Sequence, residues 1–243
     1  MARLLITGSS DGIGALMAKR LISQGHQVVL HARNAQRAAD AQAACPGAHA
    51  CLIGDLTSIE QTRQLAADAN KHGPYDAVVH NAGVWSGPNV FPVNTLAPYV
   101  LTCLMDRPKR LVFVSSGLHR SGRGKLGRPE DVGYGDSKLH DIMLAKGFAK
   151  RWPEVASNAA DPGWVPTKMG GNNAPGSIEA SVDCFISVAL GQGEAKEVTA
   201  KYFQSNPCRV SSCAPDAEDV GLQDALFKQL ADKSGVEVPL TTA

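Results

Sequence analysis

The segment TGSSDGIG, residues 7–14, joins the first apolar run of the chain, RLLIT (3–7), to the first segment with helical periodicity, 12–24. Gly8 permits a tight turn, Gly12 allows a ligand to approach the backbone, and Gly14 allows the helix to pack on a sheet. Free N–H groups at a helix start favour a phosphate. The segment therefore predicts a site for a phosphate-containing ligand, with an ordinary glycine-rich connection as the alternative.

Beyond this turn, short apolar runs alternate with helical segments along the whole chain. The expected strands are 3–7, 27–32, 49–55, 75–82, 110–116, 155–161 and 201–204. The expected helices are 12–24, 35–44, 58–71, 95–105, 134–152, 177–190 and 216–233. This order predicts an α/β fold, a Rossmann-type, doubly wound parallel sheet of about seven strands with helices on both faces, as a single domain over residues 1–243.

The composition excludes several classes of function. A formal net charge of +1 argues against nucleic acid as a partner. The apolar run in MARLLITGSS is too short for a signal peptide or a membrane span, so we expect a cytoplasmic protein. The six cysteines form no C-x-x-C pair, and we expect reduced thiols and no metal site, a disulfide or metal at Cys208 and Cys213 being the minor alternative.

The stretch GYGDSKLHD, residues 133–141, places Tyr134 four positions before Lys138, on one face of a helix. An unperturbed tyrosine, with a pKa of about 10, is a poor acid catalyst near neutral pH. An ammonium group at ~4 Å favours phenolate by roughly 4 kcal/mol at an effective dielectric near 20, but by only ~1 kcal/mol in water. The pair would therefore serve as an acid/base only in a cleft, and a chance pair on an exposed helix is the alternative.

The ordered series TGSSDGIG, NAG (81–83), Ser116, Y-x-x-x-K (134–138) and PGWVPT (162–167) resembles the classical short-chain dehydrogenases/reductases. The closing segment, AKYFQSN (200–206) followed by APDAEDVGLQDALFKQLADKSGV (214–236), is similar to the strand and terminal helix of retinol-dehydrogenase-like and carbonyl-reducing members. The resemblance implies hydride transfer between NADP(H) or NAD(H) and a carbonyl or alcohol of a small apolar substrate. A non-catalytic NAD(P)-binding sensor and an S-adenosylmethionine-dependent methyltransferase on a similar sheet are the alternatives.

The same resemblance assigns four catalytic residues. It makes Tyr134 the acid/base, Lys138 the residue that lowers the tyrosine pKa and holds the nicotinamide ribose, and Ser116 the residue that binds the substrate oxygen, with Ser115 as the alternative serine. Asn94 would support a water that links the lysine to solvent, and it could also be a helix N-cap or first-turn residue.

The resemblance also implies a set of cofactor contacts. Besides Tyr134 and Lys138, these are Gly8, Ser10, Asp11, Gly12, Ile13 and Gly14 in the first turn, Arg33 after the second strand, Asp55 and Leu56 near the adenine, Asn81, Ala82 and Gly83, and Pro162, Gly163, Val165 and Thr167 near the nicotinamide. The alternative for Asp55 is that it caps the following helix. The alternative for Pro162 and Gly163 is that they form an ordinary turn.

Arg33 bears on the choice between NADP and NAD. Members that prefer NAD carry an acidic residue at the end of the second strand, where this chain has Ala32 and then Arg33. A guanidinium can bind a 2′-phosphate through two hydrogen bonds, so the sequence favours NADP(H). Asp11 weighs against this choice, and Arg33 could instead be a solvated residue that caps the next helix.

Three segments at strand ends are the expected substrate loops: 84–93, 117–132 and 162–176. Their residues Val84, Trp85, Leu118, His119, Trp164 and Met169 predict a mostly apolar pocket, with ordinary packing as the alternative. Ser116 and Tyr134 stand farther apart than is usual in the family, and Asn94 stands closer to both Asn81 and Ser116. We therefore expect a short fourth helix, which leaves a homodimer possible and disfavours a tetramer.

Overall fold

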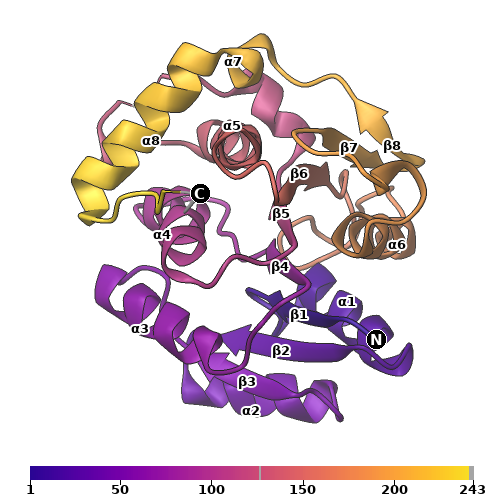
Figure 1. The fold of residues 1–243 in the computed structure, drawn as a ribbon. Helices are drawn as coiled ribbons and strands as arrows, with labels where there is room; N and C mark the ends of the chain where they lie inside the picture. Colours follow the sequence, from indigo (N-terminus) through magenta and orange to yellow (C-terminus); the bar gives the residue numbers. More distant parts are fainter. Residues whose placement is uncertain (126, 241–243) are drawn as a thin grey trace.

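A single sheet of eight strands forms the centre of the molecule (Figure 1). The computed structural model describes residues 1–125 and 127–240, so position 126 of the predicted loop 117–132 lies outside it. The strand order is β3-β2-β1-β4-β5-β6-β7-β8. The strands are β1 (Arg3–Ile6), β2 (Gln27–Ala32), β3 (Ala50–Ile53), β4 (Ala77–His80), β5 (Arg110–Val114), β6 (Ala156–Asp161), β7 (Tyr202–Ser205) and β8 (Cys208–Ser211).

The first seven strands are parallel, as expected, and β8 is an additional strand antiparallel to β7. Strand β4 is buried along its whole length, and only the first residue of β1, β2 and β5 is less than fully buried. Burial on both faces explains why these strands are continuous apolar runs. The prediction of a doubly wound α/β sheet in one domain is confirmed.

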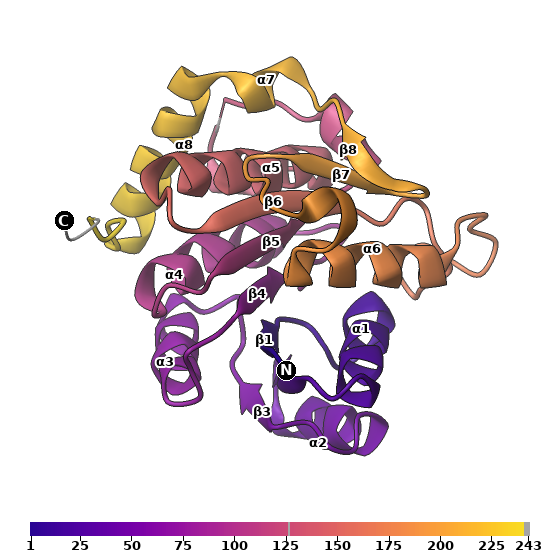
Figure 2. The same cartoon turned by 45° about the vertical axis from the view of Figure 1, so that its right-hand side comes forward.

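Helices cover both faces of the sheet (Figure 2). The helices are α1 (Gly12–Ser23), α2 (Ala35–Ala44), α3 (Ile59–Asn70), α4 (Ala97–Leu104), α5 (Tyr134–Arg151), α6 (Ile178–Leu190), α7 (Pro215–Glu218) and α8 (Val220–Ser234). One apolar cluster joins α1, α2 and α6 to the sheet, and the other joins α3, α4, α5 and α8 to its opposite face. Within the described part of the chain, no helix is both long enough and apolar enough to cross a bilayer.

The fourth helix departs from the prediction of a helix over 95–105. A π-helical segment, η1 (Phe91–Leu96), precedes α4, and the N–H of Ala97 donates to the carbonyl of Pro92, five residues earlier. Pro98 has no N–H, so the regular i to i−4 ladder is broken here. The predicted loop 84–93 consequently ends at Val90, and α4 itself is short, as the spacing predicted.

Two cysteines are not the reduced thiols that the sequence suggested. Cys184 in α6 and Cys208 at the start of β8 form a disulfide, with their Cα atoms 5.2 Å apart. The chain separates them by 24 positions, and only the β7–β8 hairpin brings them together. Cys45, Cys51, Cys103 and Cys213 are free.

Candidate active site

The glycine turn between β1 and α1 is packed too closely for side chains at two positions. Gly8 has a φ of +63°, and a Cβ there would lie 2.8 Å from the Cα of Ala82. A Cβ on Gly14 would lie 2.5 Å from the Nδ2 of Asn81, which donates to the carbonyls of Thr7 (2.9 Å) and Gly8 (3.2 Å). The predicted N-A-G segment therefore holds the turn in place.

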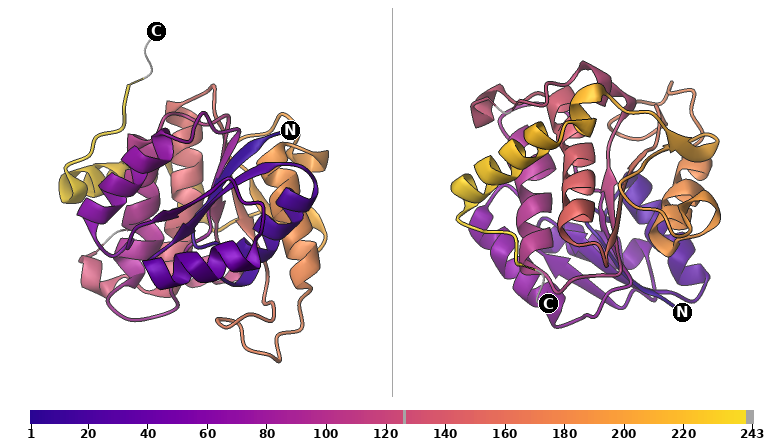
Figure 3. Two further views of the ribbon diagram at one scale, coloured as in Figure 1. Left: turned by 90° about the horizontal axis from the view of Figure 1, so that it is seen from below. Right: turned by 45° about the horizontal axis from the view of Figure 1, so that its top comes forward.

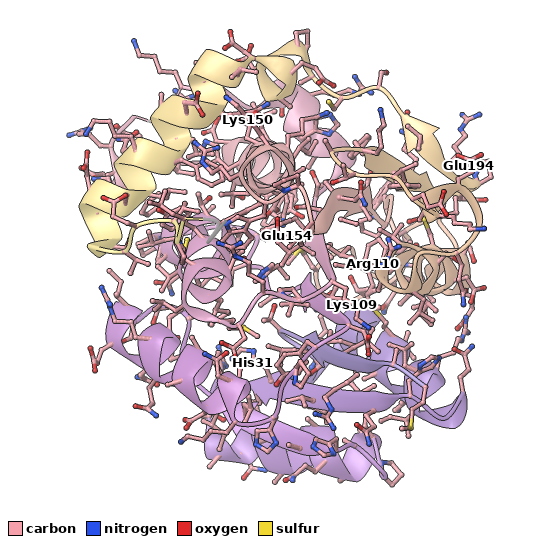
Figure 4. All side chains as sticks on the ribbon, viewed as in Figure 1. His31, Lys109, Arg110, Lys150, Glu154 and Glu194 are labelled. Carbon is pink, nitrogen blue, oxygen red and sulfur yellow. A yellow bond between two sulfur atoms is a disulfide. The ribbon has the colours of Figure 1, made fainter. Side chains whose placement is uncertain are left out.

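A buried histidine that the sequence did not single out also supports the turn. His31, labelled in Figure 4, lies in β2. It accepts a hydrogen bond at Nδ1 from the N–H of Gly8 (3.0 Å) and donates from Nε2 to the carbonyl of Gly54 (2.9 Å). Burial lowers the pKa of His31, which keeps the imidazole neutral and able to accept. The ring thus connects the glycine turn to the end of β3.

Asp11 forms ion pairs with two basic side chains at the glycine turn. It caps α1 by accepting from the N–H of Gly12 (2.8 Å), and its Oδ2 lies 2.6 Å from the Nζ of Lys168 and 3.3 Å from the guanidinium of Arg37. The hydrogen bond from Lys168 is the main cause of a lowered pKa at Asp11. Arg37 also donates to the carbonyl of Ser10 (3.2 Å). Sequence reasoning missed both cations, although Arg37 stands in the first turn of the helix after Arg33.

Arg33 follows directly on Ala32, the last residue of β2, and is exposed. Asn34 caps α2 by accepting from the N–H of Arg37 (2.9 Å), so the alternative that Arg33 caps this helix is wrong. Ile13, in the first turn of α1, packs against the apolar cluster under α1, α2 and α6.

Asp55 follows β3 but does not cap α3. Its Oδ1 accepts hydrogen bonds from the N–H (2.9 Å) and the hydroxyl (2.8 Å) of Thr57, and these bonds lower the pKa of Asp55. Ser58 is the cap of α3, so the capping alternative for Asp55 is wrong. Leu56, between them, is buried.

Tyr134 and Lys138 lie together at the start of α5. The Nζ of Lys138 is 5.5 Å from the centre of the half-buried Tyr134 ring, and the Trp85 ring lies 4.6 Å from the same ring. Lys138 is buried and donates to the carbonyl of Val114 (2.7 Å) and to the Oδ2 of Asp141 (2.9 Å). The pair therefore occupies the sheltered site that an acid/base role requires.

The two serines at the end of β5 differ in their surroundings. Ser115 is buried and donates to the carbonyl of Lys138 (2.6 Å), which ties β5 to α5. Ser116 is half-exposed, and its hydroxyl accepts a hydrogen bond from the N–H of Leu118 (3.3 Å). Ser116 therefore keeps a hydroxyl proton for a ligand, whereas Ser115 uses its own within the fold.

Two glycines allow the long connection after Ser116 to fold back onto α5. A 3-10 turn, η2 (Gly117–Ser121), packs against the first turn of α5. A Cβ on Gly122 would lie 2.4 Å from the carbonyl oxygen of Gly135, and a Cβ on Gly135 would lie 2.9 Å from the hydroxyl of Ser121. The start of the connection after Ser116 is therefore packed against the helix that carries Tyr134.

Asn94 is buried within η1 and is not an N-cap. Its Oδ1 accepts from the N–H of Val84 (2.8 Å), and its Nδ2 donates to the carbonyl of Val84 (3.0 Å) and to the hydroxyl of Ser137 (3.0 Å). A Cβ on Gly83 would lie 3.5 Å from Asn94 Oδ1 and 3.6 Å from Lys138 Nζ. Asn94, Gly83 and Lys138 therefore converge on one small space.

The segment 162–176 projects beyond the start of α6 (Figure 3) and returns to the glycine turn. The carbonyl of Pro162 accepts from Ser181 (2.7 Å), Gly163 has a φ of +75°, and Val165 is buried. A Cβ on Gly12 would lie 3.9 Å from the Cγ2 of Thr167, whose hydroxyl accepts a hydrogen bond from Gly170. The sequence-predicted nicotinamide segment thus lies beside the predicted phosphate turn.

Four of the six expected substrate-pocket residues are strongly exposed apolar side chains: Trp85 (54%), Leu118 (46%), Trp164 (64%) and Met169 (45%). Val84 is half-buried. His119 is buried, with Nδ1 donating to the carbonyl of Ser116 (2.7 Å) and Nε2 accepting from Ala214 (3.2 Å), so it does not line the pocket.

A family model described as short chain dehydrogenase matches residues 2–177. The chain belongs to the short-chain dehydrogenases. An uncharacterized oxidoreductase of Emericella nidulans is 46% identical over 98% of this chain and 99% of its own length. Retinol dehydrogenase 14 of Mus musculus is 29% identical over 210 residues, covering 69% of this chain and 62% of its own, which agrees with the resemblance to retinol-dehydrogenase-like members.

Solved structures share the fold. A blue fluorescent protein from a metagenomic library, solved in complex with NADPH, matches 84% of this chain and 95% of its own with a TM-score of 0.70 and 23% identity. Membership of an oxidoreductase family sets aside the methyltransferase and sensor alternatives. In the described ranges, no group of three or more His, Cys, Asp or Glu side chains is arranged to hold a metal ion.

Proposed function

We propose that the enzyme transfers a hydride between NADP(H) and a carbonyl or alcohol carbon of a small apolar substrate, with Tyr134 as the acid/base. The observation that carries this proposal is the arrangement of Tyr134, half-buried, beside the buried ammonium of Lys138, 5.5 Å from the ring centre. Burial of Lys138 reduces screening by water and so strengthens the effect of its ammonium on a phenolate.

The residues present fit a nicotinamide dinucleotide. At the glycine turn, Gly12 leaves its face open, because a Cβ there would meet nothing closer than Thr167 at 3.9 Å. The space beside Gly83 faces Lys138, the group expected at the ribose, and Asn94, the group expected to support a water beside the lysine. In the proposed complex, the glycine turn (Gly8, Ser10, Asp11, Gly12, Ile13, Gly14) would hold the pyrophosphate, Asp55 and Leu56 the adenine, and Pro162, Gly163, Val165 and Thr167 the nicotinamide.

When bound, the cofactor would supply or accept the hydride at C4 of its nicotinamide. The protein's own part is proton transfer and orientation. In carbonyl reduction, Tyr134 would donate its phenolic proton to the substrate oxygen, and Lys138 would stabilise the phenolate that results. Ser116 would donate a hydrogen bond to the same substrate oxygen, while Asn94 would fix Ser137 and the start of α5 through its 3.0 Å hydrogen bond.

The preference for NADP(H) over NAD(H) rests on positive charge at the end of β2. Arg33 is exposed there, and Arg37 lies one turn further along α2, held by Asp11. A phosphate on the ribose would find the exposed guanidinium of Arg33 and no carboxylate directly after β2, whereas Arg37 is already paired with Asp11 and Asp40. The carboxylate of Asp11, which counted against NADP, is already paired with Arg37 and Lys168.

The test of the cofactor proposal is a fluorescence titration with NADPH and NADH. We expect NADPH to bind at least about tenfold more tightly, a difference of ~1.4 kcal/mol. Arg33→Ser should reduce this preference, whereas Arg209→Ser, which removes an exposed arginine on β8 at the far edge of the sheet, should not. Equal binding of both cofactors to the unaltered protein would refute the NADP preference but not the fold.

The substrate pocket would be formed by the loops that begin at residues 84, 117 and 162. Trp85, Leu118, Trp164 and Met169 expose large apolar surfaces there, and Trp85 lies directly against the Tyr134 ring. We therefore propose a lipophilic carbonyl or alcohol as substrate. The short α4 is compatible with a homodimer and disfavours a tetramer.

The test of the catalytic proposal is Tyr134→Phe. We expect this change to lower kcat by about 10²-fold or more on any carbonyl that the unaltered enzyme reduces, with NADPH affinity nearly unchanged. Tyr75→Phe is the matched control, because it also removes a phenolic hydroxyl, here one that donates to the carbonyl of Ala69 outside the proposed site. Retention of more than about a tenth of the activity in Tyr134→Phe would refute the assignment.

A further inference from the structure

A second ionisable group is buried beside the proposed acid/base pair. Asp141 lies one helical turn after Lys138, with its Oδ2 2.9 Å from Nζ, and the two side chains are only 3% and 6% exposed. Burial of an unpaired carboxylate or ammonium is strongly unfavourable, so the two charges depend on each other. None of the family motifs in the sequence includes position 141.

The surroundings of the Lys138 ammonium leave Asp141 as its direct charge partner. Tyr134 and Asp141 face it from α5, the carbonyl of Val114 faces it from β5, and Asp161 lies near it at the end of β6. The carboxylate of Asp161 is already engaged, since Oδ2 accepts from the hydroxyl of Tyr202 (2.8 Å) and Oδ1 accepts from the N–H of Gly163 (2.7 Å).

The hydrogen bonds of the Lys138 ammonium also fix the orientation of the side chain. An ammonium has three donors, of which one goes to Val114 and one to Asp141, leaving the third for a ligand. Burial alone would lower the pKa of Lys138, but the negative charges of Asp141, of the Tyr134 phenolate and of Asp161 together outweigh burial and raise it, with Asp141 the largest of the three. Burial raises the pKa of Asp141 to about 6, against the pull of Lys138.

We propose that Asp141 is a positioning residue that keeps Lys138 charged and directed at the space between Gly83 and Tyr134. This inference rests on the proposed function of Tyr134. Without the carboxylate, burial would drive the lysine toward its neutral form, and a neutral amine would no longer favour the Tyr134 phenolate.

The test is Asp141→Asn, which removes the charge and keeps the size. The readout is the phenolate absorbance of Tyr134 during a pH titration of the cofactor-free protein, obtained as the difference between each protein and its Tyr134→Phe counterpart. We expect the titration to move to higher pH by at least about one unit, equivalent to a tenfold change in the ionisation constant. In the alcohol-oxidation direction, the rising limb of kcat against pH should move in the same way.

Asp136→Asn is the matched control. Asp136 is also a buried acid of α5, but it pairs with Arg123 at 2.9 Å and not with Lys138, so its loss should leave the titration in place. Asp141→Glu keeps the charge and should retain the original titration. If Asp141→Asn does not fold, Asp141→Ser is the smaller neutral replacement, and we expect the same upward shift.

If the Tyr134 titration in Asp141→Asn stays in place or moves to lower pH, the proposal is overturned. Asp141 would then have a structural role only, or its negative charge would weaken the effect of Lys138 on Tyr134. This failure is distinct from failure of the proposed function. The latter would appear as full activity in Tyr134→Phe, whatever happens at position 141.

Discussion

The buried histidine at the end of β4 makes the stability of the protein sensitive to mild acid. His80 is 3% exposed, its Nε2 lies 2.8 Å from the hydroxyl of Thr102, and its ring stacks on Phe113 at 4.8 Å. Burial lowers the pKa of His80 from 6.5 to about 3. Below pH 6.5 the imidazole of His80 therefore binds a proton in the unfolded chain, whereas in the folded chain it stays neutral down to about pH 3. The free energy of unfolding consequently decreases as the pH falls from 6.5 to 3.

The size of the effect follows from the two pKa values. Each pH unit below 6.5 removes about 1.4 kcal/mol of folding free energy per histidine, so His80 contributes a loss of about 2 kcal/mol between pH 7 and pH 5. This range lies above the ordinary pKa of Asp and Glu, which keeps most carboxylates out of the comparison. Asp141 is the exception, since its raised pKa of about 6 acts in the opposite direction.

The assay compares variants, so that contributions shared by both proteins cancel. Urea unfolding at pH 7 and pH 5 gives the loss of stability for the unaltered protein and for His80→Gln, in which the titrating group is gone. We expect the loss to be about 2 kcal/mol smaller in His80→Gln. His49→Gln, which removes an exposed imidazole, should not flatten the pH dependence in this way. A difference below about 0.5 kcal/mol for His80→Gln would refute the reasoning, because His80 would then accept a proton within the fold.

Three further predictions concern packing, the cofactor cradle and the disulfide. Gly147→Ala should cost about 1–3 kcal/mol in urea unfolding, since the new Cβ would lie 2.2 Å from Phe227, and Phe227→Leu in the same chain should restore part of the loss. Gly83→Ala should leave the thermal midpoint unchanged, because its Cβ meets nothing closer than 3.5 Å, yet weaken NADPH binding at least about tenfold; undiminished binding would place the cofactor elsewhere. Cys184→Ser should destabilise the oxidised protein by about 3.5 kcal/mol, the value for a closed loop of 24 positions, and should abolish any effect of a reductant on stability.

The sequence predicted most elements because their patterns are local. The runs in β1, β2, β4 and β5 are continuous apolar stretches, which only a sheet covered on both faces accounts for. Strand β8 was missed because its four residues, CRVS, carry no buried side chain and pair only with the neighbouring β7. The π-helical start of the fourth helix was missed because apolar periodicity cannot distinguish a π-helical turn from an α-helical one.

The sequence predicted the site residues that belong to recognisable motifs, and it missed the residues whose role depends on burial in the folded protein. The spacing of residues in the sequence is sufficient to identify Tyr134, Lys138 and the glycine turn. Asp141 stands only three positions after Lys138, yet nothing in the sequence says that both side chains are buried. The pairing of Asp11 with Lys168 could not be foreseen either, because it depends on how the segment 162–176 returns across the glycine turn.

Helix α8 has a consequence for assembly and for truncation. Phe227 packs against Gly147 and Phe148 of α5 and against Tyr99 of α4, and the hydroxyl of Tyr99 donates to the carbonyl of Val236 just beyond α8. Residues of α8 thus cover apolar side chains of α4 and α5. A shortened chain that ends before residue 220 would expose this apolar strip to solvent, and self-association of the shortened protein would be the visible result.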